Sequence, residues 1–462
     1  MPRQLALLLC GIFVFVLLRI ERRQNPTASF ALWLPTVWML LAASKPLSSW
    51  FGVYGRDIQA GSPLDRAALL AFLFVALVIL AGRGFDWGRA FRENAWLLLL
   101  VGYELISICW SDSPFVSLKR WTREAIVVPM AFVVLSERSP RAALESIFRR
   151  TVYILIPLSV LLIKYYPEYG VAFGRWGGER MWIGVTLQKN GLGRLCLFAA
   201  FLLIWTLIRR WKKRDLPVVK YQTYVEVLLL LMSLWLLKGP GRAYPATAIG
   251  ALALGLAALA CLLRLKKRQV YLSAGVTSAL IIALIVIGTL TPFLHGTTVG
   301  SLTYVFGRDE TFTGRTDIWE KLVRQVLQSP ILGHSAGGFW TSGTVTENFG
   351  VNQAHNGYLD FLLEYGFAGL LLLTIFLLSC CRKACRELTF DYDWGALWIC
   401  FLLMLIIHNF AESSIYLFSS HLTAAFVFLS VSFSRAVSFS PGDLPLNFRP
   451  SAAWALKGGH KQ

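Results

Sequence analysis

Charge is scarce in this sequence. Asp, Glu, Lys and Arg together make up 15% of its 462 residues, whereas 56% are hydrophobic. The apolar residues form blocks that are too continuous to be one face of a soluble amphipathic helix. This composition excludes an ordinary soluble domain and predicts an all-α fold, a polytopic bundle of membrane-spanning helices.

The apolar blocks that approach the ~20 residues needed to cross a bilayer number about 13, within a range of about 12 to 14. No A-x-A-like cleavage site follows the first block, so we expect it to be a retained span rather than a signal peptide. The expected spans are Leu5–Leu18, Phe30–Ala43, Ala67–Ala81, Ala95–Trp110, Ala125–Leu135, Val152–Ile163, Leu192–Ile208, Tyr224–Leu237, Ala243–Leu263, Tyr271–Leu290, Gly366–Cys380, Trp394–Ile407 and Ile415–Val431.

Signatures of several other functions are missing. The 8 cysteines lie in or near expected spans or at an inner helix end, which disfavours a disulfide framework and a thiolate metal site. The sequence has no H-E-x-x-H motif and no D-x-D at the end of an outward loop, so we expect no bound metal and no cofactor. It also lacks the Gly-Lys-Ser/Thr of a P-loop and a cytoplasmic nucleotide-binding domain, which argues against a sugar-nucleotide donor.

Basic residues, in contrast, are abundant: 45 Lys and Arg against 26 Asp and Glu, a net charge of +19. The densest runs, Arg209–Arg214 and Arg264–Arg268, are suited to holding helix ends against anionic membrane lipids. No soluble domain surrounds them, so nucleic acid is a poor partner. Most basic residues fall on one side of the membrane, predicted to be cytoplasmic, if that side holds the C-terminal tail and loops 19–28, 82–94, 137–150, 209–222, 264–270 and 382–394.

One long polar insert interrupts the spans and divides the chain. We expect N-terminal spans over 1–237, a core over 238–380 that contains an outward insert at 291–356, C-terminal spans over 381–434, and a cytoplasmic tail over 435–462. A polar segment of about 60 residues among membrane helices is the natural place for chemistry.

Within the insert, apolar residues recur at helical spacing from Ile318 to Leu327. They predict a surface amphipathic helix that begins near Thr316 and ends at Ser329 and Pro330.

The insert ends at His355 and Asn356, where the next span begins. Asp360 and Glu364 follow at positions i and i+4, on one face of that span. Two carboxylates facing lipid would be costly, so we expect this face to border a hydrated cavity and to contact substrate together with Asn356. A histidine at a helix start has either a structural or a catalytic role, and both remain open here.

Two other outward segments carry cations. Gln188 to Arg194 opens a span with Lys189 and Arg194 among small glycines, where the positive end of the helix dipole suits an anion; a simple capped helix explains it equally well. Arg242 stands in a short turn between two spans. Its guanidinium is suited to phosphate, although snorkelling to the interface is an equal alternative.

Together, the outward residues Arg242, Arg308, Arg315 and His355 combine several cations with one group that titrates near neutrality. Arginine clamps suit a departing diphosphate, and an imidazole suits the activation of a hydroxyl. We therefore expect arginine side chains of the protein, rather than a divalent metal, to stabilise the departing diphosphate.

Over residues 238–378 the sequence resembles the O-antigen ligase and polymerase family of bacterial envelope enzymes. The residues that carry the resemblance are Gly241-Arg242, Gly314-Arg315, Trp319, Pro330, Gly333, His355-Asn356-Gly357-Tyr358-Leu359 and Glu364-Tyr365-Gly366. It implies a glycosyltransferase of the bacterial inner membrane whose active site faces the periplasm.

Such enzymes take a glycan from undecaprenyl diphosphate and join it to an acceptor hydroxyl, usually with inversion and without metal. By the same resemblance, Arg242 and Arg315 would bind the diphosphate, and His355 would orient or deprotonate the acceptor. Charge and placement add Arg308, Lys189 and Arg194 as substrate contacts.

The acceptor and the oligomeric state stay open. Pro240-Gly241 stands before Arg242 where a serine is common, and Gln188-Lys189-Asn190 is similar to exopolysaccharide polymerases. The acceptor is therefore a lipid A-core sugar, a growing chain or a protein. The rival function is a transporter or flippase for a lipid-linked sugar, which would also use an arginine-lined cavity. No convincing internal repeat, typical of transporters, is found.

Overall fold

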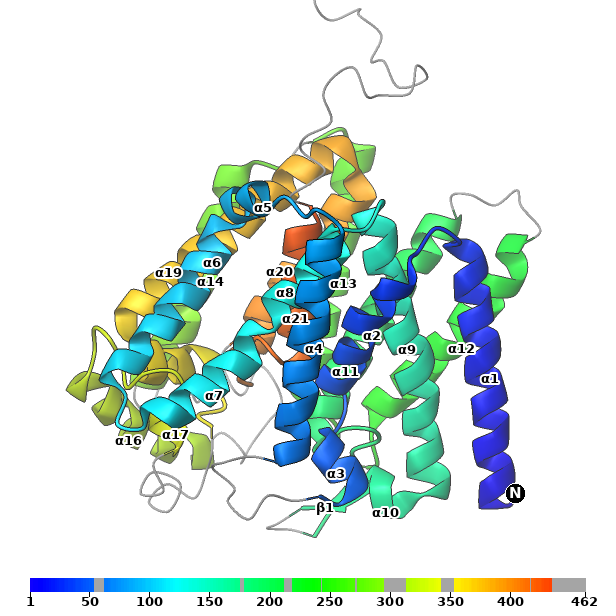
Figure 1. Ribbon diagram of the computed structural model, residues 1–462, viewed down its shortest axis with the longest axis horizontal. Helices are drawn as coiled ribbons and strands as arrows, with labels where there is room; N and C mark the ends of the chain where they lie inside the picture. The colour runs from blue at the N-terminus through cyan, green and yellow to red at the C-terminus, as the bar shows by residue number, and fades with distance from the viewer. Residues whose placement is uncertain are drawn as a thin grey trace, which may run out of the picture.

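A computed structural model gives the fold (Figure 1). It describes residues 1–53, 62–174, 178–211, 218–241, 243–270, 272–294, 313–341, 353–415 and 417–433. The described chain is almost entirely helical, which confirms the all-α membrane fold.

The long helices are α1 (Arg3–Gln24), α4 (Pro63–Gly82), α9 (Pro140–Tyr165), α11 (Lys189–Trp211), α12 (Val218–Lys238), α13 (Ala246–Lys267), α14 (Ala274–Leu290) and α19 (Gly357–Phe390). Shorter ones are α2 (Trp33–Ala42), α3 (Leu47–Phe51), α5 (Trp87–Glu93), α6 (Ala95–Ile106), α7 (Pro114–Ala125), α8 (Val127–Leu135), α10 (Pro167–Gly170), α16 (Thr313–Gln328), α17 (Gly338–Thr341), α20 (Tyr392–His408) and α21 (His421–Ser432). Three 3-10 turns are η1 (Phe30–Leu32), η2 (Ser107–Trp110) and η3 (Thr291–Phe293), and one antiparallel hairpin pairs β1 (Val171–Phe173) with β2 (Arg180–Trp182).

In the described part of the chain, 7 helices are long and apolar enough to cross a membrane, or 8 if the bent pair of α5 with α6 and η2 is one span. The apolar helices Phe30–Ala42, Tyr392–His408 and His421–Ser432 are shorter. A multi-pass membrane protein is therefore confirmed, whereas the expected count of about 13 is not.

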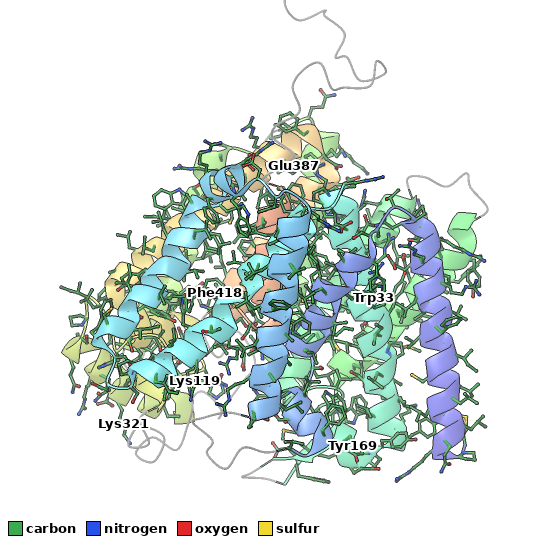
Figure 2. All side chains as sticks on the ribbon, viewed as in Figure 1. Trp33, Lys119, Tyr169, Lys321, Glu387 and Phe418 are labelled. Carbon is green, nitrogen blue, oxygen red and sulfur yellow. The ribbon has the colours of Figure 1, made fainter. Side chains whose placement is uncertain are left out.

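The helices run side by side between two ends of the molecule. Figure 1 shows α16, α17, α10 and β1 at one end, here called the insert end, and α5 at the other, the basic end. Figure 2 places Lys119, Tyr169 and Lys321 at the insert end and Glu387 at the basic end.

Buried ion pairs join neighbouring helices at the basic end. Arg150 Nε of α9 lies 2.8 Å from Glu21 Oε2 of α1, and both side chains are only 2% exposed. Arg210 of α11 similarly pairs with Glu226 of α12 at 2.8 Å. Residues 140–150, expected as part of a loop, form the first turns of α9. Their charged residue Arg150 is stable there because it has its partner Glu21 within the bundle.

The longest described helix, α19, breaks at Gly366, whose φ of 61° and ψ of −168° are not helical. A Cβ at this position would lie 2.3 Å from the carbonyl oxygen of Ile331, so only glycine fits. The break separates the first turns of the helix, which begin at Gly357, from the longer segment that ends at Phe390.

The end of the insert fills this break. The amide of Phe367 donates to Pro330 O at 2.8 Å, and the amide of Ser335 donates to Glu364 O at 2.8 Å. Gly333, with φ 69°, allows the close approach. Backbone groups left unpaired by the break are thereby satisfied, as a membrane protein requires.

Candidate active site

The site is built around the start of α19. The side chain of Asn356 caps this helix by accepting from the amides of Tyr358 and Leu359, each at 3.0 Å. Its Nδ2 also donates to Gly288 O of α14 at 3.1 Å. Asn356 is fully buried, so these contacts give it a structural role. His355, directly before the cap, has a left-handed φ of 53°.

The turn between α20 and α21 packs against this helix start. Gly357 N donates to Asn409 O at 2.9 Å, and a Cβ on Gly357 would lie 1.9 Å from Asn409 Oδ1. Asn409 Oδ1 in turn accepts from the amides of Ser414 and Ile415 at 3.1 and 3.0 Å. The two segments therefore form one tightly packed junction.

This junction brings an acidic side chain to His355. Glu412 Oε2 lies 4.0 Å from His355 Nδ1, and Glu412 Oε1 accepts from Asn190 Nδ2 of α11 at 2.5 Å. The side chain of Gln353 also contacts His355 Nδ1, at 3.2 Å. The His355 side chain is 26% exposed, whereas that of Glu412 is 5% exposed. The imidazole is thus accessible, and the carboxylate behind it is held in place.

Asp360 of α19 is hydrogen-bonded within the same junction. Its Oδ1 accepts from Trp340 Nε1 and from the amide of Ala354, both at 2.9 Å, and its Oδ2 accepts from Ser413 Oγ. The residue is fully buried. The expectation that it borders a hydrated cavity is therefore wrong: these donors replace water around the carboxylate.

Glu364 is also fully buried and lies away from His355. Its carboxylate interacts electrostatically with Glu104 of α6, which also interacts with Glu124 of α7. The hydrated cavity is thus wrong for this residue too, because Glu364 is fully buried in a helix that packs on α6.

The two expected cations of α11 lie near Asn190. Lys189 is the first residue of the helix and is partly exposed. Arg194 lies about one turn further, and its charge acts on Glu412. The Nε of Arg194 is buried and makes no hydrogen bond within the described part of the chain.

Three of the expected arginines are not, or not fully, among the described residues. Arg242 and Arg308 lie outside the described residues, and the side chain of Arg315 does as well. The backbone of residue 315 belongs to α16, one turn before Trp319 and on the same helical face. Trp319 Nε1 donates to Ala354 O at 2.8 Å, which fixes this face beside the start of α19.

The described residues that follow position 242 pack on α11. A Cβ on Gly193 of α11 would lie 2.4 Å from Cβ of Pro245, so the start of α13 packs closely on the start of α11. Among the described residues, no group of three or more His, Cys, Asp and Glu side chains is arranged to hold a metal.

Sequence reasoning missed Glu412 as a member of the site. The sequence feature that could have indicated it is the polar turn of residues 408–414, which lies between two strongly apolar helices. The sequence also gives no sign that the side chain of Asn190 reaches across to Glu412.

Comparison with known proteins gives two matches. Residues 244–374 match the family model described as O-antigen ligase. The exopolysaccharide production protein ExoQ of Rhizobium meliloti (strain 1021) is 22% identical over 305 residues, which cover 63% of this chain and 65% of that relative. The chain thus spans slightly less than two thirds of the length of ExoQ.

The helices define a multi-pass membrane protein, and its segment 244–374 is similar to the O-antigen ligase family. The match of residues 244–374 and the similarity to ExoQ confirm the family resemblance predicted from the motifs.

Proposed function

We propose that this protein transfers a glycan from undecaprenyl diphosphate to an acceptor hydroxyl at the insert end, on the periplasmic side of the inner membrane and without a metal. The observation that carries the proposal is the contact of His355 with Glu412, which Asn190 holds from a third helix. A carboxylate behind an exposed imidazole is the arrangement of a general base and the group that orients it.

In the proposed step, the acceptor oxygen attacks the anomeric carbon and forms the new glycosidic bond. The bond from that carbon to the diphosphate oxygen breaks, so undecaprenyl diphosphate leaves. The hydroxyl proton passes to His355. The Glu412 carboxylate, with Oε2 4.0 Å from His355 Nδ1, stabilises the imidazolium that forms.

The leaving diphosphate needs positive charge. We assign this role to Arg242 and Arg315, with Arg308, Lys189 and Arg194 as further contacts. Trp319 supports the assignment of Arg315, because it fixes the same face of α16 beside Ala354.

The test is reconstitution in proteoliposomes with a labelled undecaprenyl-diphosphate glycan and candidate acceptors, in the presence of EDTA. Wild type should move label to an acceptor, and His355→Ala and Arg315→Ala should not. Arg315→Lys should also be inactive, because a lysine keeps the charge and loses the paired donors. Label that only changes leaflet would overturn the proposal in favour of a flippase.

A further inference from the structure

A groove of about 790 Å³ lies between three helices at the basic end of the molecule. It is at the opposite end of α11 from Asn190, which contacts Glu412 in the candidate active site. The proposed glycosyl transfer therefore does not use it. The residues that define the groove are Leu207 and Trp211 of α11, Leu230 of α12, and Leu263, Lys266 and Lys267 of α13.

The groove follows from the way α12 and α13 pack on α11. At the insert end, the short turn 239–245 leads directly from α12 to α13, and Pro245 approaches Gly193 of α11 closely. At the basic end, Leu230 and Leu263 belong to different walls of the groove, and the last turns of α11 form its floor. The space thus lies between the two helices at the end where no such short turn joins them.

Only an apolar ligand fits the inner part of this groove. Below the mouth its lining is aliphatic, and these side chains are half-buried. They cannot hydrogen-bond a polar ligand or water, and an empty space would forfeit their dispersion contacts. The volume is within the range of about 300–1,000 Å³ for a pocket that holds one ligand. The acyl chains of one lipid molecule meet these conditions.

The mouth of the groove is cationic. Lys266 and Lys267 are exposed and line it, and Trp211, which is 69% exposed, is the third exposed residue of the lining. Lysine and tryptophan together are typical of the boundary between hydrocarbon and lipid headgroups. Arg264 and Arg268 belong to the same basic run of α13. A basic pocket between membrane helices selects an anionic headgroup.

Neighbouring side chains hold Lys266 in position. Its Nζ lies 4.8 Å from the ring centroid of Tyr392 and 3.4 Å from Asp393 Oδ1, both at the start of α20. The hydroxyl of Tyr392 donates to Leu262 O of α13 at 2.5 Å. Asp393 offsets one positive charge, and the four cations of the run Arg264–Arg268 outnumber it. The ammonium group is therefore placed before a ligand binds, which lowers the entropic cost of binding.

We infer that this groove binds one anionic diacyl phospholipid from the leaflet at the basic end, with its acyl chains against α11 and its phosphate at Lys266 and Lys267. A free phosphate would match the charge but would not fill the apolar space. A neutral phospholipid would fill the space but would leave the cations unmatched. The bound lipid stabilises the folded chain, because the unfolded chain has no such groove. This inference does not depend on the proposed function.

The test combines native mass spectrometry with thermal unfolding of the full chain in detergent. The probes are phosphatidylglycerol and phosphatidylcholine with the same acyl chains. Wild type should retain one phosphatidylglycerol, and its Tm should rise with the concentration of that lipid, whereas phosphatidylcholine should have a much smaller effect. Lys266→Gln combined with Lys267→Gln should weaken phosphatidylglycerol binding by about tenfold or more. The Tm of this variant without added lipid should match that of wild type.

Arg382→Gln combined with Arg386→Gln is the matched control. These two arginines of α19 are exposed, lie near Glu387 at the basic end and do not line the groove, so their loss should leave lipid binding unchanged. Leu230→Trp tests the apolar part, because the larger side chain should weaken binding of phosphatidylglycerol while both lysines remain.

Two results would overturn the inference. One is equal binding of the two lipids, or phosphatidylglycerol binding that neither the double lysine variant nor Leu230→Trp weakens. The other is a wild-type dimer that Leu230→Trp separates, because the groove would then hold a second copy of the chain. Neither readout measures glycan transfer, so the proposed function is tested separately.

Discussion

The carboxylate of Glu412 lies 4.0 Å from Nδ1 of His355, although one residue belongs to the turn before α21 and the other precedes α19. Each of the two segments is fixed by its own hydrogen bonds, through Asn409 and Asn356. The pair is therefore a product of helix packing rather than of a local motif.

Replacing Glu412 with Gln should lower kcat less than His355→Ala does, because the imidazole is still present. General-base catalysis contributes about 10²- to 10⁴-fold, which sets the scale for His355→Ala. A neutral amide no longer stabilises the imidazolium, so the acid limb of the pH–rate profile should move to lower pH. If Glu412→Gln lowers the maximal rate but leaves the acid limb at the same pH, the electrostatic role of Glu412 is contradicted.

Gly357→Ala should unfold the junction, because its Cβ would lie 1.9 Å from Asn409 Oδ1. We expect a lower melting temperature in detergent and loss of transfer. The matched control is Gly250→Ala in α13, where a Cβ has no neighbour within 4 Å. Alanine is the better helix former there, so this variant should be as stable as wild type or more so.

Arg150→Met should destabilise the basic end, because it leaves Glu21 buried without its ion-pair partner, and breaking such a pair costs about 3–5 kcal/mol. Adding Glu21→Leu should recover most of the loss. Disrupting the exposed pair of Arg324 and Glu320, whose side chains are 71% and 52% exposed, should have little effect on thermal unfolding. Equal losses from both pairs would show that burial does not matter here.

Trp319→Phe keeps the apolar packing of α16 and removes the hydrogen bond to Ala354, a change worth about 0.5–1.5 kcal/mol. Amide exchange of residues 318–328 should become faster, and transfer should fall because α16 is held less firmly beside the start of α19. Leu327→Ala, at an exposed site on the same helix, is the control. Unchanged exchange would mean that another contact docks α16.

Periodicity and hydropathy are sufficient to predict most of the fold. Spans such as Pro63–Gly82 are apolar after their first turn, and their ends carry local signals, as where Ser62 accepts from the amide of Leu64 at 3.2 Å. The sequence does not predict the helical start of α9. A charged residue such as Arg150 indicates a loop at the membrane surface unless its buried partner Glu21 is known.

The site was only partly predictable for the same reason. His355 and the α16 helix stand out locally, whereas the role of Glu412 depends on how α20 and α21 turn back onto α19. Asp360 was predicted to contact substrate, but tertiary structure gives it Trp340 and Ser413 as partners instead. Side chains at long sequence separation decide these cases, and no pattern within one helix reveals them.

The junction at Gly366 also limits how this protein can be recombined with its relatives. Residues 330–335 and 363–368 complete each other's backbone hydrogen bonds, so neither can be exchanged alone. A chimaera that grafts a foreign outward segment should take both strips from the same parent, or place its crossover points before residue 330 and after residue 368. Grafts cut between the two would leave buried amides and carbonyls without partners, and such hybrids should fail to accumulate in the membrane.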